Sequence, residues 1–468
     1  MRITLVGHAA LLIEAGGFTI LSDPWWRGPC FGAQWWNYPP PHLRVLEGMR
    51  LDFIYISHGH HDHFHPGTLK GLDRSAKVLV SARTDLAPGV SELGFDVIRV
   101  PDREEHRLGG DVAVRIIHTH GGDTLMAVSD GKEVALNLND ALHSAPRSVQ
   151  DDFVATLRSI YPRIDYVFCG YGVASHFPNC YVIPGKDRVR TAQRRQRYFN
   201  GQWARLVASL SPRFAFPFAA DVVFLEEDLF WVNEPTHNAE RPTALFRQLY
   251  PKSLVQVRDI GPGFALQDGS ILREVLREPV SAAKLRETYA DAIERANRYG
   301  AEDPAEVSEV FALLEANLDT CRAYLESFPD SYRFVIRFRQ AAEAVQVEKA
   351  GGTVRLSLAS LDAALAARPD LIYTTRVSYL KWSLTRPHGE EILFVGSGGI
   401  FEYRDPARAR NNLHRELMTL LRRHAKAVPP RPRPKPKLVA LARSAVKRLL
   451  GRHRPDLYDL RTWSVFTR

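Results

Sequence analysis

The stretch FIYISHGHHDHFH, residues 53–65, constrains this chain more than any other part of it. It begins with an apolar run typical of a buried β-strand and continues into a turn that holds five histidines and one aspartate. Side chains two positions apart on an extended backbone point the same way, so His58 and His60 can bind one ion together. Asp62 and His63 follow in the turn, where they can reach a second ion. Imidazole and carboxylate ligands suit zinc, iron or manganese better than calcium or magnesium.

A surface cluster of histidines or a purification tag is the alternative interpretation of this stretch. Tags are terminal, however, and do not follow a core strand. A second apolar strand ends in the same manner, because the run VAVRIIHTHGGD at residues 112–123 again places histidines two apart. We expect His118 or His120 to be the third ligand of the first ion, and the pattern does not distinguish between them. Asp123 is expected to support the loop or the site.

Residues 125–129 and 134–138 predict a hairpin around Asp130-Gly131. It delivers Asn139-Asp140 at a strand end, where the Asp140 carboxylate would bridge two cations. An Asn-Asp turn is the alternative. Upstream, residues 1–25 predict three short antiparallel strands separated by glycines, and His8 after the first strand is expected to lie near the site.

The motif His58-Gly59-His60-His61-Asp62-His63 resembles the HxHxDH signature of the metallo-β-lactamase fold, and the resemblance extends through residues 1–275. It implies an αββα sandwich with a metal-dependent active site in which Asp62 and Asp140 take part in catalysis. It also implies that Asp23, in the segment Ser22-Asp23-Pro24, orients a ligand histidine without binding metal itself. A turn-forming Asp-Pro pair is the alternative.

Several segments resemble, more narrowly, the metallo-β-lactamase half of CMP-N-acetylneuraminate hydroxylase and its bacterial relatives. They are the Asp-Pro-Trp loop, Asn139-Asp140 and residues 165–181, 212–221, 233–238 and 261–263. This resemblance implies hydroxylation of the N-acetyl group of a nucleotide-linked sialic acid. That family carries a Rieske iron–sulfur domain with Cys-x-His pairs, and no cysteine here is followed two places later by histidine. An oxygenase of this kind would therefore take electrons from a separate partner.

The final histidine that zinc hydrolases of this fold use for the second metal has no clear counterpart in the sequence. His176 and His237 are candidates by position, and Glu226 or Asp221 would substitute an oxygen ligand. A more oxygen-rich second site would favour iron or manganese over zinc. We therefore expect one or two divalent ions, with zinc and iron as the main candidates and manganese as a third.

The length of 468 residues exceeds what one ordinary core accommodates, so more than one domain is expected. Residues 276–426 predict a smaller α+β domain that faintly resembles sterol-carrier-like domains, with a role in substrate capping or oligomerisation. No run reaches 18 uninterrupted apolar residues, and the four cysteines form no CxxC motif, which indicates reduced thiols. The N-terminus has no cleavage-site pattern, so a cytoplasmic location is expected.

The positive charge of this chain is concentrated at its C-terminal end. The formal net charge is +9, but residues 417–455 contain twelve lysines and arginines and no acidic residue. Subtracting these twelve leaves a body near neutrality, so nucleic-acid binding is not expected. Residues 427–468 predict a proline-rich linker and a basic amphipathic helix at 438–450, suited to an anionic membrane surface or to docking on a protein. A further basic segment, residues 186–197, suits phosphate recognition or a solvated helix face.

Two enzymatic functions use the same ligand set. The first is a hydrolase in which metal-activated water attacks an N-acylated or phosphate-containing small molecule, such as a nucleotide sugar. The second is an iron-dependent hydroxylase of the CMP-N-acetylneuraminate hydroxylase type. A non-catalytic scaffold is the third interpretation, which so complete a ligand set disfavours.

Overall fold

The computed structural model describes residues 1–119, 122–172, 176–275, 279–301, 303–325, 330–339, 341–386 and 388–404. The expected proline-rich linker and amphipathic helix of residues 427–468 lie outside the described residues. Among the helices that are described, none combines the length and the apolar character that crossing a bilayer requires.

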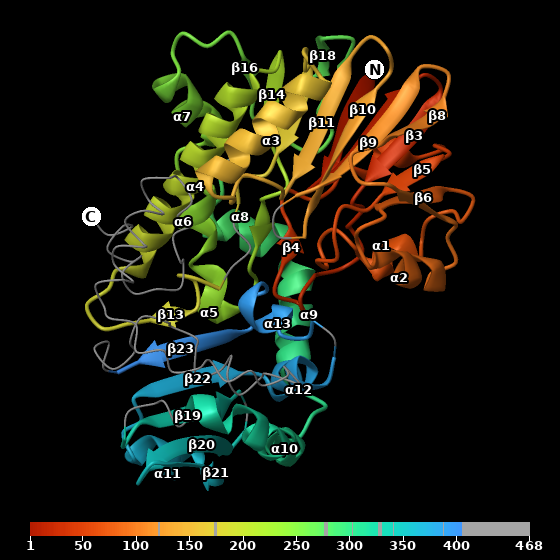
Figure 1. Ribbon diagram of the computed structural model, residues 1–468. Coiled ribbons are helices and arrows are strands. Elements are labelled where there is room, and N and C mark those ends of the chain that lie inside the picture. The colour runs from red at the N-terminus through yellow and green to blue at the C-terminus, as the bar shows by residue number, and fades with distance from the viewer. Residues whose placement is uncertain are drawn as a thin grey trace.

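The first half of the chain forms two β-sheets that pack face to face (Figure 1). The eight-stranded sheet has the order β18-β17-β1-β2-β3-β5-β6-β7. Its strands are β1 (Arg2–Gly7), β2 (Ala10–Ala15), β3 (Phe18–Ser22), β5 (Phe53–Tyr55), β6 (Lys77–Ser81), β7 (Val97–Val100), β17 (Ala265–Gln267) and β18 (Ser270–Arg273). The seven-stranded sheet has the order β16-β14-β12-β11-β10-β9-β8. Its strands are β8 (Glu105–Gly109), β9 (Val112–His118), β10 (Thr124–Ser129), β11 (Val134–Asn139), β12 (Tyr166–Cys169), β14 (Phe214–Pro217) and β16 (Gln256–Val257).

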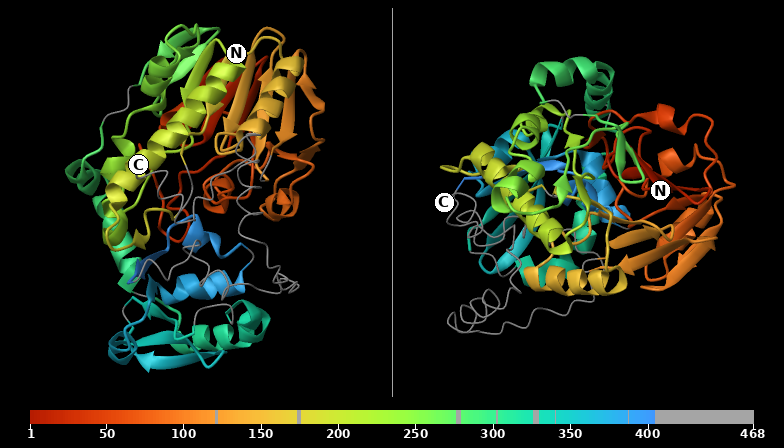
Figure 2. Two further views of the ribbon diagram at one scale, coloured as in Figure 1. Left: turned by 60° about the vertical axis from the view of Figure 1, so that its left-hand side comes forward. Right: turned by 90° about the horizontal axis from the view of Figure 1, so that it is seen from above.

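Alternation along the strands divides their side chains between the inter-sheet core and the outer helices. In β9, Ile116 packs between the sheets while Ile117 faces the helix layer, because successive strand residues point to opposite sides. Helices α3 (Arg147–Ile160) and α4 (Arg188–Leu210) cover the seven-stranded sheet, and α7 (Pro242–Leu249) packs on α4 (Figure 2). Helices α1 (Pro66–Leu69) and α2 (Leu86–Glu92) cover the other sheet. The predicted αββα sandwich is therefore confirmed.

The expected hairpin around Asp130-Gly131 is formed by β10 and β11, with Ser129 opposite Val134. Strands β11, β12, β14 and β16 then run parallel to one another, and α3, α4 and α7 make the connections between them. Parallel strands end at the same edge of their sheet, so residues that follow them gather there. Asn139-Asp140 follow β11 at this edge.

A six-stranded sheet lies below the sandwich in Figure 1, in the order β13-β23-β22-β19-β20-β21. Its strands are β13 (Tyr181–Val182), β19 (Arg333–Phe338), β20 (Glu343–Ala350), β21 (Thr353–Ser360), β22 (Leu371–Thr375) and β23 (Gly399–Tyr403). Its helices are α10 (Val307–Leu325), α11 (Leu361–Ala366), α12 (Val377–Thr385) and α13 (Glu391–Phe394), and α8 (Ala282–Thr288) and α9 (Ala290–Ala301) lead into it. Strands β20 and β21 form a hairpin about Gly351-Gly352, and β19 adds a third strand.

The two halves of the chain share one hydrophobic core. Strand β13 belongs by sequence to the sandwich, yet it pairs in parallel with β23 of the C-terminal sheet. The same core contains Trp25 and Phe31 from the first half and Phe401 from the second. Packing therefore continues across the expected domain boundary after residue 275. The boundary itself stays a prediction. Short elements at the junction are β4 (Trp36–Asn37), β15 (Val222–Val223), α5 (Glu227–Phe230) and α6 (Asn233–His237). The 3-10 turn η1 (Leu43–Leu46) packs instead in the layer of α1 and α2.

Candidate metal centre

The histidine motif begins where β5 ends, beside the end of β3. These strands pair in parallel with Ser22 opposite Tyr55, so the residues after them emerge together. Asp23 has a φ of 37°, a left-handed conformation that aspartate tolerates better than most residues. Its Oδ1 accepts the main-chain N–H of Ser57 at 2.8 Å, and its Oδ2 accepts the Ser57 hydroxyl at 2.7 Å. This fully buried aspartate therefore fixes the start of the motif loop.

His63 lies at the centre of the site and is fully buried. Its Nδ1 donates to Asp23 Oδ2 at 2.9 Å, while its Nε2 lies 3.3 Å from Asp62 Oδ2 and 3.5 Å from Asp140 Oδ2. A carboxylate on one imidazole nitrogen sets the tautomer and aims the other nitrogen, as is usual for metal-binding histidines. Asp23 thus lies where the resemblance places it, behind a candidate ligand.

The electrostatics of the site favour a cation. Burial raises the pKa of Asp62, but the neighbouring imidazoles of His63 and His8 outweigh burial and hold that pKa well below its usual range. Burial likewise raises the pKa of Asp140, while attraction to His63 prevails and lowers it to about 2. Burial lowers the pKa of His63, yet Asp62, Asp23 and Asp140 raise it well above normal. Three carboxylates therefore surround the His63 imidazole, and a divalent cation would balance their negative charge.

His58 and His60 face each other as their spacing predicts. His58 Nε2 lies 2.9 Å from His60 Nδ1, and His58 Nδ1 contacts the Ser57 hydroxyl at 3.0 Å. Burial, with added repulsion from His63 and His60, lowers the pKa of His58 to about 3, so this imidazole is neutral at physiological pH. A neutral imidazole is the form that binds metal. Asp123 Oδ1 lies 3.9 Å from His58 Nε2, at the edge of the same cluster.

Two groups of three residues have ligand atoms within 4.8 Å of one another: His58, His63 and Asp140 in the first, and His8, Asp62 and His63 in the second. Two buried atoms in these groups, His63 Nε2 and Asp62 Oδ1, have no hydrogen-bond partner among the described residues. A buried polar atom without a hydrogen-bond partner lowers the stability of the fold by about 1–3 kcal/mol. Two such atoms in one cluster therefore suit a site built to bind a ligand. The residues present therefore fit one or two divalent ions.

The other candidate ligands lie apart from these groups. His118 ends β9 and belongs to neither group, and its main-chain N–H donates to Asp102 Oδ1 at 2.8 Å. His120 lies outside the described residues, so the choice between these two histidines stays open. His176 Nδ1 donates to the main-chain oxygen of Phe394 at 2.8 Å, and its ring packs on Tyr181, in the core shared with the C-terminal sheet.

Glu226, which the sequence offers as a possible oxygen ligand, belongs to neither group. Its carboxylate forms a buried ion pair with Arg376, with Arg376 Nε 3.2 Å from Glu226 Oε1. His237 lies closer to the cluster, but its Nε2 donates to the main-chain oxygen of Val222 at 2.7 Å and its Nδ1 lies 3.5 Å from Asp221 Oδ1. The Glu226 carboxylate and the His237 imidazole therefore already contact other protein groups.

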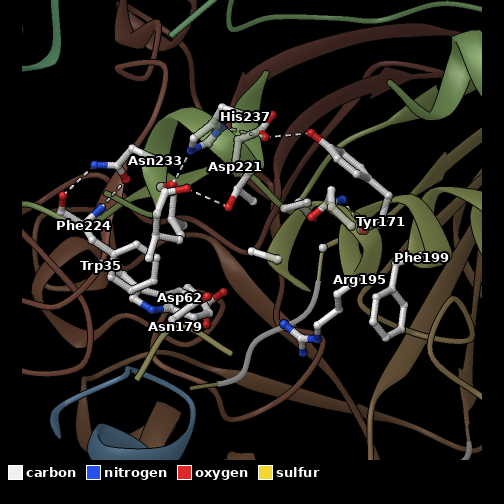
Figure 3. Close-up of a pocket in the computed structure, with 18 of the residues that line it drawn as sticks. Trp35, Asp62, Tyr171, Asn179, Arg195, Phe199, Asp221, Phe224, Asn233 and His237 are labelled. Carbon is white, nitrogen blue, oxygen red and sulfur yellow. Dashed lines mark hydrogen bonds and ion pairs between the residues drawn. The ribbon is translucent and has the colours of Figure 1, made fainter. Parts of the chain in front are cut away.

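A pocket opens beside the cluster (Figure 3). His8, Asp62 and Asp140 are among the residues that line it. The aromatic rings of Trp35, Phe199 and Phe224 form part of the remaining wall. The polar side chains in that wall are Tyr171, Asn179, Arg195, Gln196, Asp221, Asn233, Thr236 and His237. Tyr171 donates its hydroxyl to Asp221 Oδ1 at 2.6 Å and accepts a hydrogen bond from Arg241 Nη1 at 2.6 Å. The pocket therefore suits a small molecule that has both polar and apolar parts.

His8 lies closer to the candidate ligands than the sequence predicted. It was expected only near the site, but its Nε2 lies 3.1 Å from Asp62 Oδ2, within the second group of candidate ligands. The available signal was a Gly-His pair at the end of an apolar strand, the same placement that marks His118. That signal alone does not say which way the ring points.

Replacing Asp23 with asparagine is expected to weaken metal binding by about 10- to 100-fold, the usual effect of removing a hydrogen-bond partner from a ligand histidine. Asparagine tolerates the left-handed backbone at this position, so the fold should persist. The measurement is titration of the metal-free protein with Zn²⁺ by calorimetry. An affinity equal to that of the unaltered protein would show that Asp23 has no part in the site.

Parts of this chain are similar to known proteins. A family model described as "Beta-lactamase superfamily domain" matches residues 2–141, a segment that contains His8, Asp23, the histidine motif and Asp140. A putative Rieske 2Fe-2S iron-sulfur protein of Mycobacterium tuberculosis is 32% identical over 251 residues, which cover 50% of this chain and 46% of that protein. The chain thus spans about half the length of the mycobacterial relatives it matches.

Two further similarities are more limited. Cytidine monophosphate-N-acetylneuraminic acid hydroxylase of Danio rerio is 37% identical over 75 residues, or 16% of this chain and 13% of that enzyme. Among solved structures, Igni18, a metallo hydrolase from Ignicoccus hospitalis, is similar over 57% of this chain and 97% of the Igni18 chain. The sequence identity is 17% and the TM-score is 0.39. A score of this size supports no inference about the reaction.

Proposed function

We propose that this chain, a metal-dependent enzyme with the metallo-β-lactamase fold, is a hydrolase acting on a small N-acylated or phosphate-containing substrate such as a nucleotide sugar. The observation that carries the proposal is the cluster of imidazoles and carboxylates beside a pocket that polar and apolar side chains line together. Within that cluster, His63 Nε2 and Asp62 Oδ1 are buried without a hydrogen-bond partner among the described residues.

In this proposal, His58 and His60, together with His118 or His120, hold one ion, and Asp62, His63 and Asp140 hold a second. Bound divalent ions would lower the pKa of a coordinated water and polarise the bond to be cleaved. Asp140 is ionised at neutral pH and is about one-fifth exposed (21%) at the pocket, so it can accept a hydrogen bond from water and orient it. No serine or cysteine nucleophile is required.

The pocket supports a polar substrate with an acidic or amide group. Arg195 on α4 lines it and is 7% exposed, and a guanidinium pairs well with phosphate or carboxylate oxygens. Asn179 also lines it, and an amide side chain both donates and accepts hydrogen bonds. Phe199 and Phe224 add apolar walls against which a sugar or base ring would pack.

A second candidate, iron-dependent hydroxylation, is supported by the relatives rather than by the geometry. The mycobacterial relatives are named as putative Rieske iron-sulfur proteins, and a short segment matches CMP-N-acetylneuraminic acid hydroxylase. Hydroxylation by dioxygen needs two electrons from a donor, which an electron-transfer partner would supply. Hydrolysis needs only water and the substrate, and we prefer it for that reason.

The dependence of turnover on dioxygen separates these two functions. We expect the protein to release product from CMP-linked N-acylated sugars or p-nitrophenyl phosphodiesters at the same rate in anaerobic and aerated buffer. Metal content measured by mass spectrometry after purification without added metal accompanies the assay. Iron in the protein together with a strict need for dioxygen and a reductant would replace the proposed hydrolase with the hydroxylase.

A further inference from the structure

We propose that His8 is a metal ligand and completes, with Asp62 and His63, the second metal site. The inference rests on the metal dependence of the proposed function and specifies a ligand for which the sequence offered other candidates. It assigns to His8 the place of the missing final histidine, for which His176 and His237 were considered.

The β1–β2 hairpin places His8 at the site. Gly7 is opposite Ala10, so His8 and Ala9 form the tight connection between the strands, with a β-irregularity just before it. His8 adopts a φ of 43°, a left-handed conformation that is uncommon outside glycine and concentrates at functional positions. The side chain is buried, and its ring meets that of Trp25 edge to face at 5.1 Å.

The hydrogen bonds of His8 set its tautomer. Its Nδ1 lies 3.3 Å from the main-chain oxygen of Asp221, and a carbonyl can only accept, so Nδ1 carries the hydrogen of that bond. The opposite nitrogen, Nε2, lies 3.1 Å from Asp62 Oδ2. A carboxylate oxygen and an imidazole lone pair at this distance require a proton or a metal ion between them.

His63 is held in the same manner from the other side. Its Nδ1 donates to Asp23, and its Nε2 faces the same oxygen, Asp62 Oδ2, at 3.3 Å. Two imidazoles thus turn their Nε2 atoms toward one carboxylate while an acceptor holds each Nδ1. This arrangement, with an outer acceptor behind each ring, is typical of metal-binding histidines. A divalent transition metal such as zinc, iron or manganese suits two imidazoles and one carboxylate.

The two other histidines do not share this arrangement. His237 lines the same pocket, but its Nε2 donates to the main-chain oxygen of Val222 and its Nδ1 approaches Asp221. His176 packs among Tyr181, Phe394 and Phe401 in the shared core. His237 therefore serves as a matched control for His8, as a buried histidine at the same pocket whose nitrogens bind protein acceptors.

The test compares Co²⁺ binding by the full chain, His8→Ala, His8→Gln and His237→Ala. The readouts are cobalt per chain after dialysis and the visible absorption of bound Co²⁺, with circular dichroism as a check on folding. We expect stoichiometry to fall from about two ions to about one in both His8 variants and to stay at about two in His237→Ala. His8→Gln guards against a folding defect, because glutamine retains a polar side chain of similar length.

The outcomes separate the two proposals. If the unaltered chain binds two ions and both His8 variants also bind two with unchanged spectra, His8 is not a ligand, while the proposed function is unaffected. A loss of one ion in His237→Ala instead of the His8 variants would transfer the role to His237 and overturn the inference. If the unaltered chain binds no Co²⁺, the proposed function fails together with it.

Discussion

Replacing His63 with alanine is expected to remove tightly bound metal and to lower kcat/KM by more than about 100-fold. Loss of a partner behind a ligand already costs about 10- to 100-fold, and loss of the ligand itself should cost more. His63 contributes to both groups of candidate ligands and is the residue that Asp23, Asp62 and Asp140 surround. Metal content and steady-state kinetics measure the two effects. His60→Ala is expected to act in the same direction.

His61 offers a control within the same motif. It is exposed, lies in neither group of candidate ligands, and stacks on Phe31 with ring centroids 5.4 Å apart. His61→Ala should therefore retain the metal and most of the activity. If His63→Ala retained as much metal as His61→Ala, the motif would not be the metal site.

Replacing Arg376 with methionine is expected to lower the free energy of unfolding by about 3–5 kcal/mol, the usual cost of removing one partner of a buried ion pair. Arg376 and Glu226 are each only 6% exposed in their side chains, and the pair joins the sandwich to the C-terminal sheet. The Glu226 carboxylate would remain buried, with Arg339 Nη2 at 3.8 Å as partial compensation. Urea unfolding followed by tryptophan fluorescence measures the change.

The same substitution at an exposed pair provides the comparison. Arg107 and Glu105 have side chains that are 74% and 44% exposed, and a pair of this kind contributes about 0–1 kcal/mol. Glu226→Gln in the Arg376→Met background should recover part of the lost stability, because it removes the unpaired charge. A change of less than about 1 kcal/mol for Arg376→Met would show that the pair does not hold the two sheets together.

The parts of the fold that depend on local pattern were predictable from the sequence. The strand at residues 112–118 and the turn at Asp130-Gly131 are each contained in a few consecutive residues, and both match the structure. The histidine motif is equally local, and the facing nitrogens of His58 and His60 follow from their spacing. Asp140 lies in the cluster because it directly follows β11, whose end lies beside His63.

The parts that depend on distant contacts were not predictable. His8 is aimed by a carbonyl 213 positions away, Glu226 pairs with an arginine 150 positions away, and His176 bonds to a carbonyl 218 positions away. No local pattern distinguishes a histidine that faces a metal site from one that faces a core. For the same reason, the two residues of β13 gave no sign that they would extend the C-terminal sheet.

Anomalous diffraction from crystals of the full chain loaded with zinc tests the metal site most directly. We predict a peak at about 2.0–2.2 Å from His63 Nε2, with Asp62 or Asp140 oxygen at a similar distance and a second peak beside His58 and His60. An anomalous map with no peak at His63, or with peaks only at surface histidines, would contradict the proposed metal centre.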